Sequence, residues 1–345
     1  MKYKIIQAVN YPLIPMMKAD YDKLNAKRIV INCKSEADLI RECGDADALI
    51  VTGMTPLKKE VIKLLERCRI IAVIGIGYQV DIEAATQKGI CVVNVPDYCL
   101  DEVSDHAMAL ILACTRKINQ LTAAVKKGLW DSSARVLIRE GIWPGMAKLR
   151  GATLGLVGFG KIARHMVPKA QGFGMNIVAY TPHPDPDVAK KSDVTLCGLN
   201  DLIEVSDYIS LHCPLVQANY HLFNESRLAK MKPTAFLINT ARGPLIDEKA
   251  LYEALVNGNL AGAGLDVLEQ EDPPDPENPL LSLPQVIVTA HSAHYSETAM
   301  DILKQRPDQA IYELLRGKWP KGMINGEVKA AYEKKWGCMS SPLEI

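Results

Sequence analysis

The sequence predicts an α/β protein that contains two doubly wound parallel sheets. Short β-branched runs alternate with helical patterns along most of its 345 residues, and this alternation is typical of βαβ units. The length corresponds to two domains at about 150 residues per domain. An amphipathic stretch, residues 102–127, separates two series of strands. We expect it to be one helix that joins the sheets, with Asp101 as its N-cap and Gly128 as its stop.

Each series of strands is marked by short apolar runs. The strands expected in the first sheet are residues 5–9, 29–31, 48–51, 70–74 and 91–95, and those in the second sheet are residues 154–157, 177–180, 208–211, 235–239, 264–267 and 286–289. Between the later strands, Asn224 and Asp247 are expected to cap helices over residues 225–231 and 248–257.

The C-terminal part of the chain is predicted to hold one more helix. This segment, residues 296–317, contains Pro307, which lacks a backbone N–H and should kink or split the helix. Residues 331–345 are polar and weakly patterned, so we expect a mobile tail there.

The composition excludes several classes of protein. Hydrophobic residues make up 48% of the chain and charged residues 23%, which is typical of a folded globular protein and not of a collagen-like, coiled-coil or disordered one. The 40 Lys and Arg residues balance the 40 Asp and Glu residues. This balance gives no indication of a nucleic-acid or acidic-membrane partner.

Compartment and metal content are inferred from apolar runs and cysteines. The longest strongly apolar run, Ala107 to Cys114, is too short to span a bilayer, and the N-terminus lacks a signal-peptide pattern. The nine cysteines are odd in number and form no C-x-x-C pair. We therefore expect reduced thiols, no metal site and a cytoplasmic protein.

A glycine-rich turn carries the strongest indication of function. Gly158, Gly160 and Ala163 follow an expected strand and open a helix, in the G-x-G-x-x-G/A pattern that binds a dinucleotide pyrophosphate. The alternative is a tight strand–helix turn without a ligand, but strand, helix and spacing together favour a cofactor site. Gly75-Ile76-Gly77 also follows a strand, but Val80 in its third position indicates an ordinary loop.

The choice between NAD and NADP depends on the residues at the end of the strand that follows the glycine turn. The acidic residue expected about 20 positions after the glycines, to bind the adenosine ribose, is missing. Thr181 ends that strand, and no Arg or Lys stands beside it to bind a 2′-phosphate. NAD is the expected cofactor, and NADP is the alternative.

Further motifs place this turn in a known family. They are Asn94-Val95-Pro96, Asp101-Glu102-Val103-Ser104-Asp105-His106, residues 155–163, Leu211-His212-Cys213-Pro214-Leu215, Ile238-Asn239-Thr240-Ala241-Arg242-Gly243, Gly264-Leu265-Asp266-Val267, Glu269-Gln270-Glu271 and His291-Ser292-Ala293. In this order and spacing the chain resembles the D-isomer-specific 2-hydroxyacid dehydrogenases, in particular the branch that looks like C-terminal-binding-protein-type dehydrogenases. The resemblance covers about residues 45 to 328.

The resemblance implies how the two domains are divided. Residues 1–101 and 298–330 would form a discontinuous, flavodoxin-like substrate domain, and residues 102–297 an inserted Rossmann domain for the dinucleotide. The active site would lie in the cleft between them. Family members are usually homodimers that associate through the long helix and the loop after it, where Trp130 and Trp143 are expected to pack.

The resemblance also implies which residues contact the cofactor. They are Gly158, Gly160, Lys161, Ile162, Thr181, Cys213, Pro214, Thr240, Ala241, Asp266 and His291. Asp266 would hydrogen-bond the nicotinamide carboxamide. His212 is expected to line the same cleft, and His106, His165 and His221 to be structural.

Reduction of a 2-oxo acid needs a group that binds the carboxylate and a group that gives a proton to the alkoxide. Arg242 suits the first role, because a guanidinium binds a carboxylate bidentately and polarises the neighbouring carbonyl. His291 suits the second as general acid or base, with Glu271 fixing its tautomer. Alone, each of the three has an ordinary structural interpretation; the family pattern favours the catalytic one.

The substrate side departs from the family pattern. Backbone N–H groups of Ile76 and Gly77 are expected to bind the substrate carboxylate, yet the loop from Val73 to Asp81 is one residue short. His294 stands where the related branch often has Trp. It is a candidate to contact a polar or anionic part of the substrate, and a surface histidine without a ligand is the alternative. The identity of the acid and the direction of the reaction therefore stay open.

Two other functions compete with a D-2-hydroxyacid dehydrogenase. One is an NADH-sensing, corepressor-like binding protein, which would keep the glycine turn but need no proton donor. The other is oxidation of an acid such as formate or phosphite by the same hydride chemistry. The intact set of Arg242, Glu271 and His291 favours the dehydrogenase over the sensor.

Overall fold

The chain folds into two units, as a computed structural model shows. It describes residues 2–9, 21–33, 35–53, 55–130, 134–271 and 273–339. The first unit comprises Met1–Tyr98 and Ser296–Ile345, and the second comprises Cys99–Tyr295. Each is built on its own parallel sheet, so the predicted α/β class is confirmed. No helix among the described residues is both long and apolar enough to cross a membrane.

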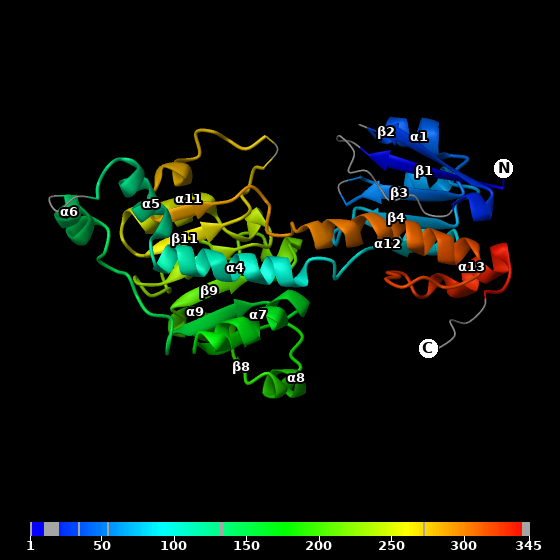
Figure 1. The fold of residues 1–345 in the computed structure, drawn as a ribbon. Coiled ribbons are helices and arrows are strands. Elements are labelled where there is room, and N and C mark those ends of the chain that lie inside the picture. The colour runs from blue at the N-terminus through cyan, green and yellow to red at the C-terminus, as the bar shows by residue number, and fades with distance from the viewer. Residues whose placement is uncertain are drawn as a thin grey trace. The chain divides into compact units, whose positions relative to one another are not determined.

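The first unit has a five-stranded sheet with strand order β2-β1-β3-β4-β5. Its strands are β1 (Tyr3–Val9), β2 (Ala26–Asn32), β3 (Ala48–Thr52), β4 (Ile70–Ile74) and β5 (Cys91–Val93), and its helices are η1 (Tyr21–Leu24), α1 (Glu36–Cys43), α2 (Lys59–Leu64), α3 (Ile82–Gln87), α12 (Glu297–Leu315) and α13 (Val328–Trp336). Helices α1 to α3 pack on one face of this sheet, and α12 and α13 on the other (Figure 1). The order is that of flavodoxin-like sheets.

The second unit has a seven-stranded parallel sheet with strand order β12-β11-β10-β9-β6-β7-β8. Its strands are β6 (Thr153–Val157), β7 (Asn176–Tyr180), β8 (Thr195–Leu196), β9 (Tyr208–Leu211), β10 (Phe236–Asn239), β11 (Gly262–Leu265) and β12 (Val286–Val288). Counted from β6, this is the dinucleotide-binding order with one strand added beyond β11. The edge strand β8 is absent from the sequence-based expectation because two residues are too short to show a pattern.

Helices cover both faces of the second sheet. They are α4 (Leu100–Thr115), α5 (Ile118–Lys126), α6 (Ala134–Gly141), α7 (Lys161–Gly172), α8 (Pro186–Lys191), α9 (Leu199–Val205), α10 (Glu225–Leu228) and α11 (Glu248–Val256), with short 3-10 turns η2 (Gln217–Asn219), η3 (Gly243–Leu245) and η4 (Pro279–Ser282). Helices α4 and α7 pack on one face, and α9, α10 and α11 on the other. Figure 1 shows α4 and α7 beside each other.

The stretch predicted to be one long helix is two. Helix α4 begins at Leu100 after Cys99, so Asp101 lies within the helix and is not its N-cap. Lys117 has a φ of +50°, in the left-handed region, and ends the first helical run. Helix α5 then runs to Lys126 and is followed by Gly128 with a φ of +83°, as expected for a helix stop.

Two features of the C-terminal part differ from the expectation. Helix α12 is not split at Pro307, because Pro307 is buried and apolar packing on both sides of it outweighs one missing hydrogen bond. Residues 331–336 complete helix α13 instead of forming a tail. Tyr332 is only 1% exposed and its ring lies 5.2 Å from that of Trp319. Residues 340–345 lie outside the described part.

Candidate active site

The glycine turn joins β6 to α7 in the second unit. Gly158 has a φ of +94°, and a Cβ atom there would lie 2.7 Å from the carbonyl oxygen of His212. Both its conformation and its close approach to the neighbouring strand therefore require glycine. Ala163 is fully buried, so the first turn of α7 packs closely on the sheet. Lys161 and Ile162 form that first turn.

Two observations show that a ligand fits against this turn. A Cβ atom at Gly160 would meet nothing within 4 Å, so the backbone there faces open space at the start of a helix. The Thr240 hydroxyl, which follows β10, is buried and has no hydrogen-bond partner among the described residues. A helix N-terminus attracts phosphate groups, and a buried hydroxyl needs an acceptor or donor. The residues fit a dinucleotide.

This arrangement predicts different effects for two similar glycine substitutions. Gly160→Ala should leave the free energy of unfolding unchanged within about 0.5 kcal/mol and weaken NADH binding by about tenfold or more, because the methyl group enters the space for the pyrophosphate. Gly158→Ala should lower the free energy of unfolding by about 2 kcal/mol. Urea unfolding and NADH fluorescence titration measure the two effects. Undiminished NADH binding by Gly160→Ala would contradict the assignment of this turn.

The ends of β7 and β9 lie next to the turn in the sheet order. Thr181 follows β7, and its hydroxyl accepts a hydrogen bond from the His183 N–H at 3.3 Å. Burial raises the pKa of the Cys213 thiol to about 11, so the thiol stays protonated and unreactive. Burial also lowers the pKa of His212 to about 4, which leaves its ring neutral near pH 7. Pro214 is exposed.

A buried side chain fixes the turn that carries Arg242. The Asn239 amide donates to the Arg242 carbonyl at 2.9 Å, and its oxygen accepts from the Ala241 N–H at 2.9 Å. A Cβ atom at Gly243 would lie 1.8 Å from the Leu268 carbonyl oxygen, so only glycine fits there. The sequence motif contains both residues, but their supporting roles are visible only in three dimensions. The Arg242 side chain is exposed.

His291 and Glu271 form a hydrogen-bonded pair. The ring Nδ1 of His291 donates to Glu271 Oε2 at 2.7 Å, and Glu271 Oε1 accepts from the Leu268 N–H at 3.2 Å. The bond to Glu271 raises the pKa of His291, whereas partial burial and the nearby charge of Arg242 oppose the shift. The pair thus leaves Nε2 of a readily protonated ring for proton transfer.

Asp266 is the most buried of the predicted site residues. Its side chain is 1% exposed, and its Oδ2 accepts from the Ala293 N–H at 2.9 Å. His294 lies close by, with its ring 6.0 Å from that of His291 and nearly perpendicular to it. Burial, and then the charge of His291, lower the pKa of His294.

The two substrate-loop residues belong to the first unit. Ile76 follows β4, and its carbonyl oxygen accepts from the Asn94 amide at 2.7 Å. Gly77 packs against Gly53, where a Cβ atom would lie 2.4 Å from the Gly77 carbonyl oxygen. These contacts fix the shortened loop, and its role in binding a substrate stays a prediction.

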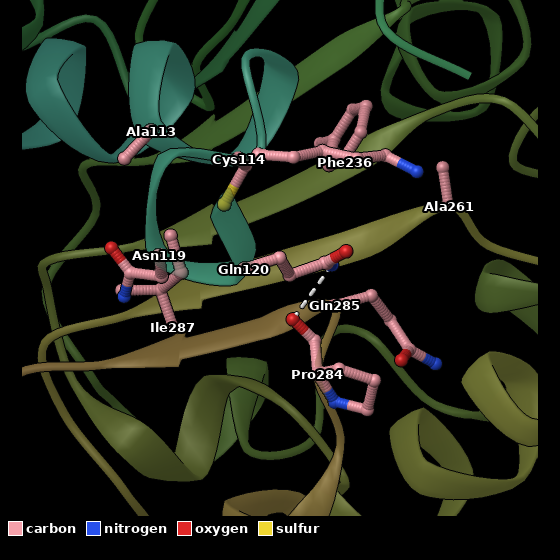
Figure 2. A pocket seen from close by; sticks show the side chains of 10 residues that line it. Ala113, Cys114, Asn119, Gln120, Phe236, Ala261, Pro284, Gln285 and Ile287 are labelled. Atoms are coloured by element: carbon pink, nitrogen blue, oxygen red, sulfur yellow. Dashed lines mark hydrogen bonds between the residues drawn. The ribbon is translucent and has the colours of Figure 1, made fainter. Parts of the chain in front are cut away.

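A small cavity lies at the amino ends of the strands, away from these residues. Figure 2 shows it between the end of α4, the start of α5 and the segments that lead into β10 to β12. Its volume is about 20 Å³, enough for about one water molecule. Gln120 closes one side by donating to the Pro284 carbonyl oxygen at 2.8 Å. The cavity is too small for a nucleotide.

In the described part of the chain, no three His, Cys, Asp or Glu side chains form a group that could hold a metal ion.

Comparisons with known proteins identify the family of the chain. A family model described as "D-isomer specific 2-hydroxyacid dehydrogenase, NAD binding domain" matches residues 108–293. D-3-phosphoglycerate dehydrogenase from Methanocaldococcus jannaschii is 40% identical over 84% of this chain and 54% of that protein. Glyoxylate reductase from Korarchaeum cryptofilum is 36% identical over 85% of this chain and 87% of that protein.

A solved structure shows the same similarity in three dimensions. D-lactate dehydrogenase from Aquifex aeolicus, complexed with NAD and lactic acid, has a TM-score of 0.76 and 25% identity, covering 93% of this chain and 99% of that chain. The chain therefore spans nearly all of that dehydrogenase, most of the glyoxylate reductase and about half of the phosphoglycerate dehydrogenase.

Proposed function

The chain belongs to the D-isomer-specific 2-hydroxyacid dehydrogenase family, and we propose that it is an NAD(P)-dependent oxidoreductase that interconverts a 2-oxo acid and a D-2-hydroxy acid. The observation that carries this proposal is the hydrogen bond between His291 and Glu271, with Arg242 near enough to oppose the rise in the pKa of His291. A protein that only senses a nucleotide has no chemical need for such a pair.

The three side chains divide the reaction between them. Bound nicotinamide supplies the hydride in reduction and takes it in oxidation. Arg242 binds the substrate carboxylate bidentately and polarises the neighbouring carbonyl. His291 gives its Nε2 proton to the developing alkoxide in reduction, and in oxidation takes the hydroxyl proton. Glu271 holds the ring in the tautomer with Nδ1 protonated and stabilises the imidazolium form.

The second unit holds the cofactor turn and the reacting side chains in this proposal. It binds the dinucleotide at the turn around Gly160 and carries Arg242, Glu271 and His291. NAD is the proposed cofactor because no Arg or Lys stands beside Thr181 to bind a 2′-phosphate. The Asp185 carboxylate does not replace the missing ribose-binding acid, because it caps α8 by accepting from the Val188 N–H at 3.1 Å.

A panel of acids tests the function. Purified protein is mixed with NADH, then NADPH, and with 2-oxo acids from glyoxylate to aromatic and dicarboxylic members, while nicotinamide absorbance is followed. We expect consumption of NADH with one class of acid. If no 2-oxo acid gives turnover with NADH or NADPH, and neither formate nor phosphite gives turnover with NAD+, although NADH binds, the dehydrogenase proposal is wrong and the sensor alternative takes its place.

The pH dependence gives a sharper test of the acid–base pair. Because the bond to Glu271 raises the pKa of His291, Glu271→Gln should lower that pKa. Reduction needs protonated His291 and is lost as pH rises through its pKa, so this loss should move to lower pH in the variant. Oxidation needs the neutral ring and should begin at lower pH.

Profiles of kcat/KM against pH in both directions measure the shift. Glu269→Gln is the matched control, because Glu269 lies in the same loop and accepts from the Glu248 N–H at 3.0 Å, not from His291. Superimposable profiles for Glu271→Gln and the unsubstituted protein would refute the pairing.

We also propose a homodimer that associates through the region of α6. Large apolar side chains are exposed there: Trp130 is 68%, Val136 50%, Leu137 63% and Trp143 48% exposed. Such a group of exposed apolar residues is typical of a protein interface.

Leu137→Asp is expected to convert a dimer into a monomer in analytical ultracentrifugation, because a buried charge is costly. Leu64→Asp, at a 46% exposed leucine of α2, is the control that should keep the dimer mass; a dimeric Leu137→Asp would refute the interface.

The state of the cysteines supports a cytoplasmic location, which we propose. None of the nine forms a disulfide in the described part of the chain, and Cys43, Cys68 and Cys91 have pKa values raised to about 12, mainly by burial. Buried, protonated thiols are stable in a reducing compartment.

A further inference from the structure

A hydrogen-bonded chain connects helix α4 to the segment that carries His291. His106 Nε2 on α4 lies 2.9 Å from Thr289 Oγ1, and Thr289 Oγ1 lies 2.5 Å from Asp266 Oδ1. The threonine hydroxyl has one proton, and an ionised carboxylate can only accept. Thr289 therefore donates to Asp266, and His106 Nε2 donates to Thr289. All these residues lie within the second unit.

Asp266 holds the segment on both sides of His291. Its Oδ1 also accepts from the Ser292 N–H at 3.0 Å, and its Oδ2 accepts from the Ala293 N–H at 2.9 Å. The Asp266 carbonyl oxygen accepts from the N–H of His291 itself at 2.8 Å. At 1% exposure the carboxylate is shielded from water, so each of these bonds is stronger than it would be on the surface.

The backbone of His291 needs this support. Its φ of +49° lies in the left-handed region, which a histidine adopts at a cost. This conformation aims the ring so that Nδ1 meets Glu271 Oε2 at 2.7 Å. A strained backbone persists only where surrounding bonds determine it, and here the bonds run through Asp266.

We propose that His106 and Thr289 are positioning residues that keep the His291 ring in its reactive orientation. The inference rests on the proposed role of His291 as general acid and base. Neither residue touches the reacting atoms: Thr289 orients the Asp266 carboxylate, and His106 orients the Thr289 hydroxyl. The charged or titratable groups that face the His291 ring are those of Glu271, Arg242, Asp266 and His294.

A purely structural role for these bonds makes a different prediction. If these bonds only stabilise the fold, their loss would lower the unfolding temperature and leave the pKa of His291 unchanged. Loss of positioning lengthens the bond from His291 to Glu271, which is the largest cause of the raised pKa of His291. The pKa of His291 should then fall together with kcat.

Matched variants separate the two roles. Thr289→Val removes the hydroxyl and keeps the shape, whereas Thr289→Ser keeps the hydroxyl. His106→Phe removes the ring donor, whereas His106→Gln keeps an N–H donor at a similar reach. We expect Thr289→Val and His106→Phe to lower kcat by about 10–100-fold with little change in the KM for NADH, and the two conservative variants to stay near the unsubstituted protein.

The second readout needs neither cofactor nor substrate. The pKa of His291 is measured by histidine NMR in the protein alone, with its signal among the seven histidines assigned by its loss in His291→Gln. Thr289→Val and His106→Phe should lower this pKa toward that of Glu271→Gln. An unchanged pKa and kcat in both variants would overturn the proposal, as would a fall in unfolding temperature alone. If one variant fails to fold, the other decides.

The same readout distinguishes this inference from the proposed function. An unsubstituted protein without turnover on any acid would refute the dehydrogenase assignment, but the dependence of the His291 pKa on Thr289 would still be measured. Normal turnover with no such dependence would refute only the positioning role.

Discussion

Replacing His291 by alanine is expected to lower kcat by about 10²–10⁴-fold in both directions, while NADH binding persists. The loss arises because His291 is the ring that Glu271 holds at 2.7 Å, and its Nε2 exchanges the proton with the alkoxide. The glycine turn and Thr240, which we expect to hold the dinucleotide, belong to other loops of the second sheet. Steady-state kinetics and NADH fluorescence measure the two effects.

Chemical rescue and a second histidine test the interpretation. The His291 side chain is 47% exposed, so added imidazole can enter the space that the substitution leaves and restore part of the turnover. His165→Ala is the control, because His165 also pairs with a carboxylate, Asp101, at 3.2 Å, but on the face of α7 toward α4. Full turnover by His291→Ala, or an equal loss in His165→Ala, would refute the catalytic role.

The features that the sequence predicts correctly have local causes. The strands of both sheets are short apolar runs, and parallel strands buried on both faces must be continuously apolar. The glycine turn is recognisable because its backbone geometry excludes side chains at Gly158 and needs open space at Gly160. The fold class, the family resemblance and the dependence on NAD(P) that these features predict are confirmed.

The features that the sequence does not predict depend on contacts between residues that are distant along the chain. The break at Lys117 has no glycine or proline beside it, so the helical pattern continues across it. Helix α13 is polar in sequence, and it is held by contacts such as the Arg69 guanidinium 4.4 Å from the Trp336 ring. Within the site, Thr289 lies 183 positions from His106, and no local pattern indicates that they meet.

Arg242→Ala is expected to lower kcat/KM for the acid by about 10²–10³-fold. The guanidinium forms no ion pair among the described residues, and its one hydrogen bond there is from Nη1 to the Ala241 carbonyl oxygen at 2.6 Å. Its remaining N–H groups are thus available for an anion. A carboxylate bound by two parallel N–H···O bonds loses both on truncation, and the carbonyl next to it is no longer polarised.

A lysine at the same position separates charge from geometry. Arg242→Lys keeps the positive charge but cannot form the bidentate contact, so it should recover part of the binding, seen in KM, and little of kcat. Arg41→Ala is the control, because Arg41 is a surface residue of α1 that pairs with Asp38 at 2.9 Å. If Arg242 only held its own turn in place, lysine and alanine would lower the unfolding temperature alike and leave the KM for the acid unchanged. A large KM effect that lysine partly reverses shows that the positive charge of the side chain acts on the substrate anion and does not merely support the turn.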